Sequence, residues 1–277
     1  MKITSSQVAV ITGGASGIGF GLAEALAARG VHLVLADVRE GALEPAADAL
    51  RAMGAEVATV RTDVSDRDSV AELASRTFEL FGRVDLVCNN AGLICPGAPL
   101  WEQDTQTWDR MIAVKIMGVI HGVQAFAPIM IKQGTGHFLN TASSGGLAPL
   151  PNRTPYTATM HAVVGLTETL DIELKAAAPA LGATVLCPGL VDTALGQNSA
   201  SLGAIRLPAG AEGAMRSIAA ASGGILSPLE VAEAAIAAVE QDRVHVAPGH
   251  DVLARARARV EALLTDLELS GHVIETR

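Results

Sequence analysis

Short apolar runs alternate with longer stretches rich in alanine and leucine, and this alternation constrains the fold more than any other feature. Strict alternation of strands and helices implies a parallel sheet covered by helices on both faces. We therefore expect one α/β domain over residues 1–277. The predicted strands are Val8–Thr12, His32–Ala36, Glu56–Arg61, Val84–Asn89, His137–Thr141, Ala183–Cys187 and Val244–Ala247. The predicted helices are about Gly17–Arg29, Glu40–Met53, Arg67–Phe81, Thr105–Lys132, Pro155–Ala178, Pro228–Gln241 and Val252–Leu267.

The composition excludes several classes of function. The formal net charge of -9 argues against binding to nucleic acids, which need a basic face, and against docking on anionic lipids. No apolar run looks long enough to span a bilayer, and Met1 leads almost directly into the first predicted strand without a signal peptide. Cys88, Cys95 and Cys187 show no metal-binding spacing and favour a reducing, cytoplasmic compartment. We expect no bound metal.

One segment, Leu195–Leu226, interrupts the alternation. It is rich in glycine, alanine and serine, with apolar residues scattered through it. A long insertion without a clear period is typical of a lid or a binding loop. A disordered excursion would carry more charge. We therefore predict a lid over about residues 195–226 and a hydrophobic substrate beneath it.

A glycine-rich turn lies between the first predicted strand and the first predicted helix. Gly13, Gly17 and Gly19 follow a G-x-x-x-G-x-G spacing, and the turn also contains Ser16 and Ile18. Glycines at such a turn let backbone N–H groups approach a pyrophosphate at a helix N-terminus, and a serine hydroxyl can add a contact. The turn lies at the start of a β-α-β unit. This position favours dinucleotide binding rather than a glycine turn that binds no ligand.

An acidic residue, Asp37, ends the second predicted strand, about 20 residues after the glycine turn. A carboxylate there accepts hydrogen bonds from ribose hydroxyls and repels a 2′-phosphate, which favours NAD over NADP. Arg39 would favour NADP if it turned inward, and Asp37 would still oppose the phosphate. Asp63 and Val64 end the third strand, where the carboxylate either meets the adenine amino group or serves as an ordinary N-cap or turn residue.

The chain resembles the short-chain dehydrogenase/reductase family up to about residue 193. The resemblance rests on TGGASGIG, Asp63, Asn89-Asn90-Ala91-Gly92, Tyr156 and Pro188-Gly189 in combination. The runs GGASGIGFG and LADVR look most like bacterial aryl-alcohol Cα-dehydrogenases and related NAD-dependent members. The resemblance implies a doubly wound Rossmann fold with seven strands in the order 3-2-1-4-5-6-7. It also implies a homodimer or homotetramer that pairs the two long central helices.

The resemblance implies further contacts with the cofactor. Asn90, Ala91 and Gly92 would line it, and the run from Pro188 and Gly189 through Val191 to Thr193 would hold the nicotinamide carboxamide. In the family, a serine holds the substrate oxygen and a tyrosine transfers the proton while the nicotinamide transfers the hydride. Ser143 and Tyr156 match these positions.

Two other family positions hold different residues. The lysine expected four residues after Tyr156 is replaced by Met160, and the asparagine expected on the preceding long helix is replaced by Lys115. Lys115 lies among apolar residues at helical spacing, such as Ile112 and Val119, so it is predicted to face inward. An inward lysine must snorkel, lose its proton or find a partner. Met160 is predicted to be a core residue.

The arrangement around Lys115 depends on the neighbouring helix. Gly118 and Gly122 on the same helix suggest a closely packed neighbour, and the helix of Tyr156 is the candidate. A nearby ammonium would lower the pKa of Tyr156 by about 1–3 units, whereas a tyrosine without one stays protonated at neutral pH. Either Lys115 supplies the missing charge, or the site has lost ordinary carbonyl chemistry. Cys95, Trp101, Leu147 and Leu150 are predicted to shape the substrate pocket.

Three functions remain open on this evidence. The first is an NAD(H)-dependent oxidoreductase for a hydrophobic secondary alcohol or ketone, with an aromatic substrate favoured. The second is a reductase of imine or iminium C=N bonds, although a cationic Lys115 would repel an iminium. The third is a catalytically impaired protein that binds NAD without turnover.

Overall fold

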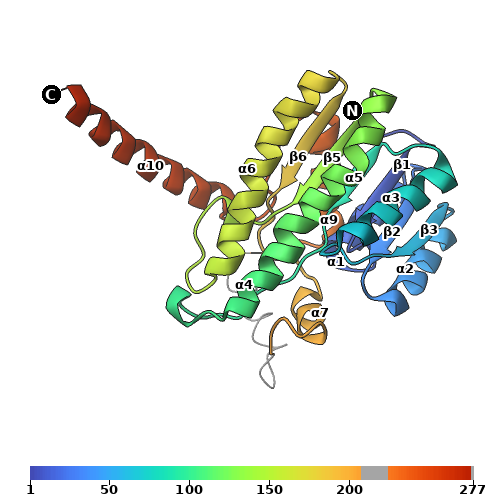
Figure 1. Ribbon diagram of the computed structural model, residues 1–277, viewed down its shortest axis with the longest axis horizontal. Helices are drawn as coiled ribbons and strands as arrows, with labels where there is room; N and C mark the ends of the chain where they lie inside the picture. Colours follow the sequence, from blue (N-terminus) through green and yellow to red (C-terminus); the bar gives the residue numbers. More distant parts are fainter. Residues whose placement is uncertain (207–223, 276–277) are drawn as a thin grey trace.

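Seven parallel strands form one sheet in the order β3-β2-β1-β4-β5-β6-β7, as predicted (Figure 1). The computed structural model describes residues 1–206 and 224–275, with side chains described as far as Leu269. The chain enters the sheet in the middle, builds outward to β3, and then crosses β1 to build the other half. The strands are β1 (Val8–Thr12), β2 (His32–Asp37), β3 (Val57–Arg61), β4 (Leu86–Asn89), β5 (Gly136–Thr141), β6 (Leu181–Leu186) and β7 (His245–Val246).

Helices cover both faces of the sheet. Those packed on one face are α1 (Gly17–Ala27), α2 (Glu40–Ala52) and α9 (Pro228–Glu240). Those on the other are α3 (Arg67–Phe81), α5 (Gly118–Gln133) and α6 (Thr154–Ala177). The shorter elements are α4 (Thr105–Met111), α7 (Leu195–Ser201) and the 3-10 turns Leu100–Glu102 and Ser144–Gly146.

The two faces follow from the alternation of side chains along each strand. In β1, Ala9 and Ile11 join the core beneath α1, α2 and α9, whereas Val8 and Val10 join the core beneath α3, α5 and α6. Successive side chains of a strand point to opposite faces, so a strand covered on both sides must be apolar at every position. This explains the continuous apolar runs that the sequence shows.

One predicted helix is divided in the structure. The stretch predicted as Thr105–Lys132 consists of α4, a π-helical turn η2 (Ile112–Met117) and α5. By length and apolar composition alone, Thr105–Gln133 matches a membrane-spanning helix, contrary to the expectation that no run is long enough. In the structure, Phe126 and Met130 of this stretch are buried against the sheet, which gives its apolar character a place in the core.

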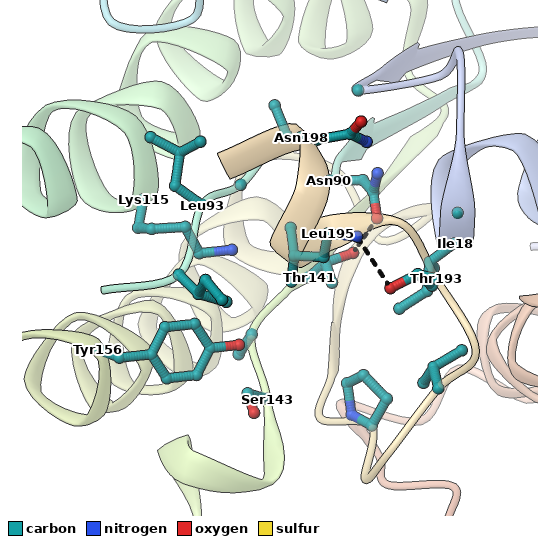
Figure 2. Close-up of a pocket in the computed structure, with 18 of the residues that line it drawn as sticks. Ile18, Asn90, Leu93, Lys115, Thr141, Ser143, Tyr156, Thr193, Leu195 and Asn198 are labelled. Carbon is teal, nitrogen blue, oxygen red and sulfur yellow. Dashed lines mark hydrogen bonds between the residues drawn. The ribbon is translucent and has the colours of Figure 1, made fainter. Parts of the chain in front are cut away.

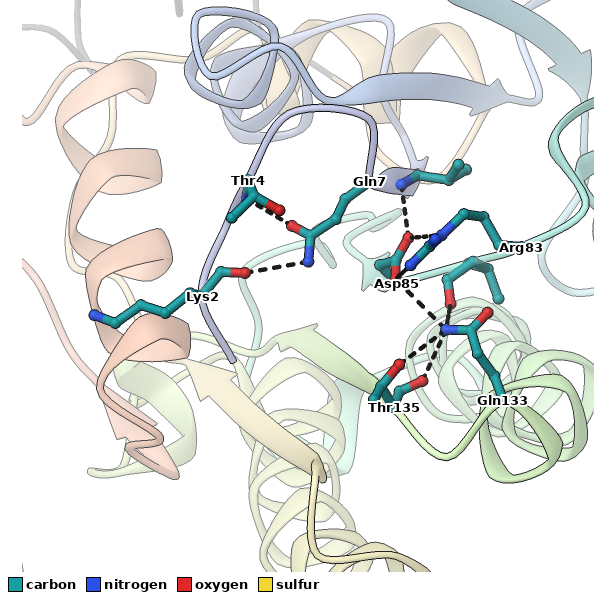
Figure 3. A network of polar contacts seen from close by, with 9 residues as sticks. Lys2, Thr4, Gln7, Arg83, Asp85, Gln133 and Thr135 are labelled. Carbon is teal, nitrogen blue, oxygen red and sulfur yellow. Dashed lines mark hydrogen bonds and ion pairs between the residues drawn. The ribbon is translucent and has the colours of Figure 1, made fainter.

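A polar network fixes the edge of the sheet where β1, β4 and β5 begin (Figure 3). The buried carboxylate of Asp85 accepts a hydrogen bond from the backbone N–H of Val8 at 2.9 Å and pairs with the Arg83 guanidinium at 2.7 Å. The Gln133 side chain donates to the carbonyl groups of Val84 and Thr135, both at 3.0 Å. These contacts fix the amino ends of the three strands. The pocket described below lies at the opposite edge of the sheet, where the strands end.

The lid and the C-terminal helix differ from expectation in their bounds. Within the predicted lid, the described part contains α7, and the rest, residues 207–223, lies outside the described residues. The C-terminal helix α10 (Val252–Glu275) extends beyond the predicted end at Leu267 and projects away from the rest of the molecule (Figure 1).

Candidate active site

A pocket of about 680 Å³ opens at the carboxyl ends of the central strands. Parallel α/β sheets place their ligand sites at this edge, beside the point where the strand order reverses. The pocket brings together nearly all the residues that the sequence singled out. Lining it are Gly13, Ser16, Gly17, Ile18, Asp37, Asp63, Val64, Asn90, Ala91, Gly92, Lys115, Ser143, Tyr156, Pro188, Gly189, Val191 and Thr193.

The glycine-rich turn has the backbone that its spacing predicts. Gly13 and Gly17 have φ values of +64° and +55°, a region that side chains other than glycine avoid. Helix α1 begins at Gly17, so its first N–H groups face the pocket without intrahelical partners. Gly19 does not line the pocket. A Cβ there would lie 2.2 Å from the carbonyl oxygen of Gly13, so Gly19 serves the packing of the turn.

Two threonines that the sequence analysis did not identify brace the loop after β4. The Thr12 hydroxyl accepts hydrogen bonds from the backbone N–H groups of Asn90 at 2.9 Å and Ala91 at 3.1 Å. The Thr141 hydroxyl donates to the side-chain oxygen of Asn90 at 3.2 Å (Figure 2). A hydroxyl residue at the end of each of two central strands is the signal that could have pointed to this role.

Asp37 lies at the end of β2 and is buried, but it is already engaged by Arg39. The carboxylate accepts from the Arg39 backbone N–H at 3.0 Å and from its guanidinium at 3.2 Å. Arg39 turns inward: its guanidinium also donates to the Ser16 hydroxyl at 3.0 Å and to the Asn198 side-chain oxygen at 2.8 Å. Asn198 belongs to α7, so one arginine joins the glycine turn, β2 and the described part of the lid.

Asp63 is a turn residue, one of the two alternatives left open for it. Its carboxylate accepts hydrogen bonds from the backbone N–H of Ser65 at 2.9 Å and from the Ser65 hydroxyl at 2.6 Å. The N-cap of α3 is Asp66, whose carboxylate accepts from the backbone N–H of Asp68. Asp63 still lines the pocket, so a turn role and a contact with a ligand are compatible.

Ser143 and Tyr156 face each other in the pocket (Figure 2). Ser143 follows β5, and its hydroxyl accepts from the backbone N–H of Gly145 at 3.2 Å. Burial raises the pKa of Tyr156 above its ordinary value, and the hydrogen bond with Ser143 partly lowers it again. The phenol is therefore protonated at neutral pH. This favours a proton donor over a base.

Lys115 points into the same pocket from the π-helical turn η2. Its side chain is only 5% exposed and lies against Gly92, where an added Cβ would come within 2.5 Å of Nζ. No carboxylate pairs with it among the described residues. Burial lowers its pKa from 10.5 to about 8. An inward lysine must snorkel, find a partner or lose its proton, and this environment favours partial loss of the proton.

The packing around Lys115 differs in two ways from the prediction. Gly118 approaches Val64, in the turn after β3, and Gly122 approaches Asn89, at the end of β4, so neither glycine packs against the helix of Tyr156. Ile112, the first residue of the π-helical turn, is 40% exposed and does not face inward. Met160 is fully buried in the core beside Val163 and Val185, as predicted, and leaves no charge at its position.

The residues predicted to shape the substrate end divide into two groups. Cys95 and Leu150 line the pocket, whereas Trp101 is 84% exposed and Leu147 packs against the core beside Met160. Trp101 sits in a short 3-10 turn that holds it on the surface. Two arginines that the sequence analysis did not consider, Arg153 and Arg255, also line this end. No cluster of three or more possible metal ligands occurs within residues 1–206 and 224–275.

Comparison with known proteins gives a consistent result. The sequence profile of a family described as short chain dehydrogenase matches residues 7–202. The chain is similar to the CLA biosynthesis dehydrogenase/reductase of Lactiplantibacillus plantarum, with 38% identity over 70% of this chain and 68% of that protein. It is 36% identical to an uncharacterized oxidoreductase of Staphylococcus saprophyticus over 85% of this chain and 92% of the other.

Solved structures extend the similarity to the whole fold. A short chain dehydrogenase/reductase from Burkholderia phymatum, solved in complex with NAD, is 40% identical and superposes with a TM-score of 0.86. The match covers 98% of this chain and 97% of that one. Levodione reductase is 31% identical, with a TM-score of 0.79 over 89% of this chain and 97% of the other.

Proposed function

The chain belongs to the short-chain dehydrogenase family, and on this premise we propose that it is an NAD(H)-dependent oxidoreductase acting on a hydrophobic, aromatic-type secondary alcohol or ketone. The observation that carries the proposal is the convergence of Ser143, Tyr156 and Lys115 in one pocket with the glycine-rich turn. An NAD-bound relative of the same fold supports the choice of cofactor.

The residues at the nucleotide end fit a dinucleotide. Gly13 and Gly17 leave the backbone of the turn open, and the N-terminus of α1 favours a pyrophosphate. Asp37 is placed to accept hydrogen bonds from ribose hydroxyls, for which the Arg39 guanidinium must share its carboxylate. When bound, the nicotinamide supplies or accepts a hydride.

The chain's own residues would hold the substrate and move the proton. The Ser143 hydroxyl holds the substrate oxygen, and Tyr156 donates its phenolic proton to that oxygen during reduction. Lys115 has a pKa of about 8, well below that of an ordinary lysine, so it is suited to return a proton to the Tyr156 phenolate. The raised pKa of Tyr156 makes it a poor base, so reduction should be faster than oxidation at neutral pH.

Imine reduction is a second candidate because of one observation. A cationic lysine would repel an iminium, but burial lowers the pKa of Lys115 to about 8. A substantial fraction is therefore neutral at mildly alkaline pH. An iminium carries its own proton and needs only the hydride, so it depends less on Tyr156.

We also propose a reducing, cytoplasmic location and a homo-oligomeric assembly. Cys88, Cys95 and Cys187 are all free and buried. An apolar groove along α5 and α6, lined by Ile120, Val123 and Leu166, supports pairing of the long central helices.

The pH dependence of turnover tests the proposal, measured in both directions with ketone and imine substrates. In wild type, we expect ketone reduction to exceed oxidation at pH 7 and oxidation to rise as the pH increases. Lys115→Met should slow ketone turnover at least tenfold while NAD binding, measured by calorimetry, persists. Unchanged pH profiles in Lys115→Met would remove Lys115 from the chemistry. NAD binding without turnover of either substrate class would identify a binding protein.

A further inference from the structure

Two guanidinium groups lie at the substrate end of the pocket without a carboxylate partner. Arg153 donates to the carbonyl oxygen of Cys95, and Arg255 donates to that of Pro149 at 3.3 Å. Neither forms an ion pair within the described part of the chain. Each guanidinium has five N–H donors, so one backbone carbonyl leaves most of them unsatisfied by protein.

Both arginines are held near the reacting groups. Residues 149–153 form the loop between Ser143 and Tyr156, and Leu150 of this loop packs close to Gly145. The Arg255 guanidinium donates to the carbonyl oxygen of Pro149 at the start of this loop, and Arg153 is the last residue of the loop. The Arg153 side chain lies one helical turn before Tyr156, and its positive charge slightly offsets the rise that burial causes in the pKa of the phenol.

The local charge balance at this end is positive. The acid that also lines it is Asp251, whose carboxylate pairs with His250 at 2.9 Å. Lys115 adds a positive charge below about pH 8. The rest of this end is apolar, with Leu93, Ile94 and Leu190 among its lining residues.

We propose that the substrate carries a carboxylate at the end remote from its reacting carbon, bound by Arg153 and Arg255, on an otherwise apolar body. A planar guanidinium matches a carboxylate with two parallel hydrogen bonds. This inference rests on the proposed function, since it names the substrate class of the same pocket.

A matched pair of ketones tests this inference: para-acetylbenzoate and its uncharged methyl ester. We expect the carboxylate to have a KM at least tenfold lower than that of the ester. Arg153→Gln and Arg255→Gln should each raise the KM of the carboxylate about tenfold and change that of the ester less than twofold. The control is Arg76→Gln, which removes an exposed arginine of α3 paired with Glu79. Equal KM values for the two ketones in wild type would overturn the inference.

Equilibrium binding separates this inference from the proposed function. With NAD present, calorimetry compares benzoate, benzamide and phenyl phosphate. Benzoate binding that exceeds benzamide binding and is lost in Arg153→Gln supports the carboxylate site even if neither ketone is turned over. Equal binding of benzoate and benzamide, or tighter binding of phenyl phosphate, would contradict it. Failure of NAD itself to bind would contradict the proposed function instead.

A second, independent observation concerns helix α10, which projects from the body (Figure 1) and carries an exposed apolar stripe. Leu253, Val260, Leu263, Leu264 and Leu267 are between 46% and 70% exposed. At 3.6 residues per turn, they fall within about 100° of the helix circumference, as in a helix that packs against a partner. Leu269 lies on the opposite side.

The charges of α10 indicate which partner. Arg255, Arg257 and Arg259 lie in its first half, and Asp266 and Glu268 lie in its second. This order opposes the helix dipole, which favours acidic residues at the N-terminus and basic residues at the C-terminus. Pairing with an antiparallel copy makes this order of charges favourable, because the basic part of each helix then meets the acidic part of the other.

We infer that α10 pairs with α10 of a second copy of this chain, antiparallel and with the two-fold axis between Ala262 and Leu263. This register buries the apolar stripe of both helices. On one edge it sets Arg257 opposite Glu268 of the second copy, and on the other edge it sets Arg259 opposite Asp266. The contact is separate from the groove along α5 and α6.

Sedimentation velocity of the full chain tests this pairing. Leu264→Glu should halve the oligomer mass or raise its dissociation constant at least tenfold, whereas the control Leu269→Glu, on the other side of α10, should not. Arg257→Glu should weaken the assembly, and adding Glu268→Arg should restore it. Leu263→Cys, beside the two-fold axis and within the apolar stripe, should form a disulfide-linked dimer on mild oxidation, unlike Leu269→Cys. An unchanged mass in Leu264→Glu, or no rescue by the double exchange, would overturn the pairing.

Discussion

The two ends of the pocket differ in the groups that form their surfaces. At the nucleotide end, the glycine turn and the N-terminus of α1 contribute a surface of backbone groups. At the substrate end it is formed by long side chains, among them Lys115, Arg153 and Tyr156. A backbone surface is fixed by steric rules that few sequences satisfy. A side-chain surface can change by single substitutions while the fold persists, so specificity is expected to vary at that end.

The largest expected effect is at the substrate end. Tyr156→Phe removes the proton donor and should lower kcat for ketone reduction by about 10²–10⁴-fold, the usual contribution of a positioned acid. NAD binding should remain close to wild type, because the glycine turn is unaltered. Steady-state kinetics measures kcat, and calorimetry measures the affinity for NAD. A loss of less than tenfold would show that another group donates the proton.

A large effect on stability is expected from Lys115→Met. The pKa of Lys115 is lowered in the folded protein to about 8, so the unfolded chain binds more protons between about pH 8 and pH 10.5. The buried ammonium therefore destabilises the folded wild type fully below pH 8, and this destabilisation disappears as the pH rises to 10.5. Lys115→Met should raise the free energy of unfolding by up to about 3 kcal/mol at pH 7.

Denaturant titrations of both proteins across pH 7–11 check this prediction. The difference between wild type and Lys115→Met should shrink as the pH rises. A difference that stays constant with pH would show that Lys115 is as well solvated as a surface lysine.

A smaller effect is expected at the nucleotide end. Asp37→Ser should weaken NAD binding about tenfold and strengthen NADP binding, because it removes the ribose acceptor and frees the Arg39 guanidinium. Asp48→Ser, in an exposed residue of α2, is the matched control. Calorimetry with each dinucleotide measures the change. Tighter binding of NADP by the wild type would contradict the role of Asp37.

The smallest effect is expected where α7 meets the nucleotide end. The Asn198 side chain accepts from Arg39 at 2.8 Å and donates to the Ser16 hydroxyl at 3.1 Å. Asn198→Ala should speed NAD dissociation about threefold, since each such bond contributes on the order of 1 kcal/mol or less. Stopped-flow fluorescence and hydrogen exchange of residues 195–201 measure this. Equal rates in Asn198→Ala and the control Ser201→Ala would separate α7 from nucleotide release.

The same contrast explains what could be predicted from the sequence. The placement of Gly13 and Asp37 was predicted from periodicity and turn chemistry, which act locally, whereas the order of the strands and the placement of Asn90 were predicted only through the resemblance to a known family. The inward position of Lys115 was also predicted, but its neighbours were not. Whether Gly118 approaches α6 or Val64 depends on how the helices pack.

Other residues were missed for related reasons. Arg153 and Arg255 are far apart in sequence, and only the tertiary fold brings both to the pocket. Trp101 was predicted to shape the substrate pocket, but it lies in a short 3-10 turn and is exposed.

The π-helical turn η2 has a consequence for changes in chain length. A π turn closes its hydrogen bonds over five residues instead of four, so it accommodates an extra residue within an otherwise continuous helix. Deleting one residue between Ile112 and Met117 would restore α-helical geometry and keep both α4 and α5 in place. The side chains of the shortened turn would be redistributed by about 100° per residue. A single-residue insertion or deletion is thus a way to exchange the group that enters the pocket at this point.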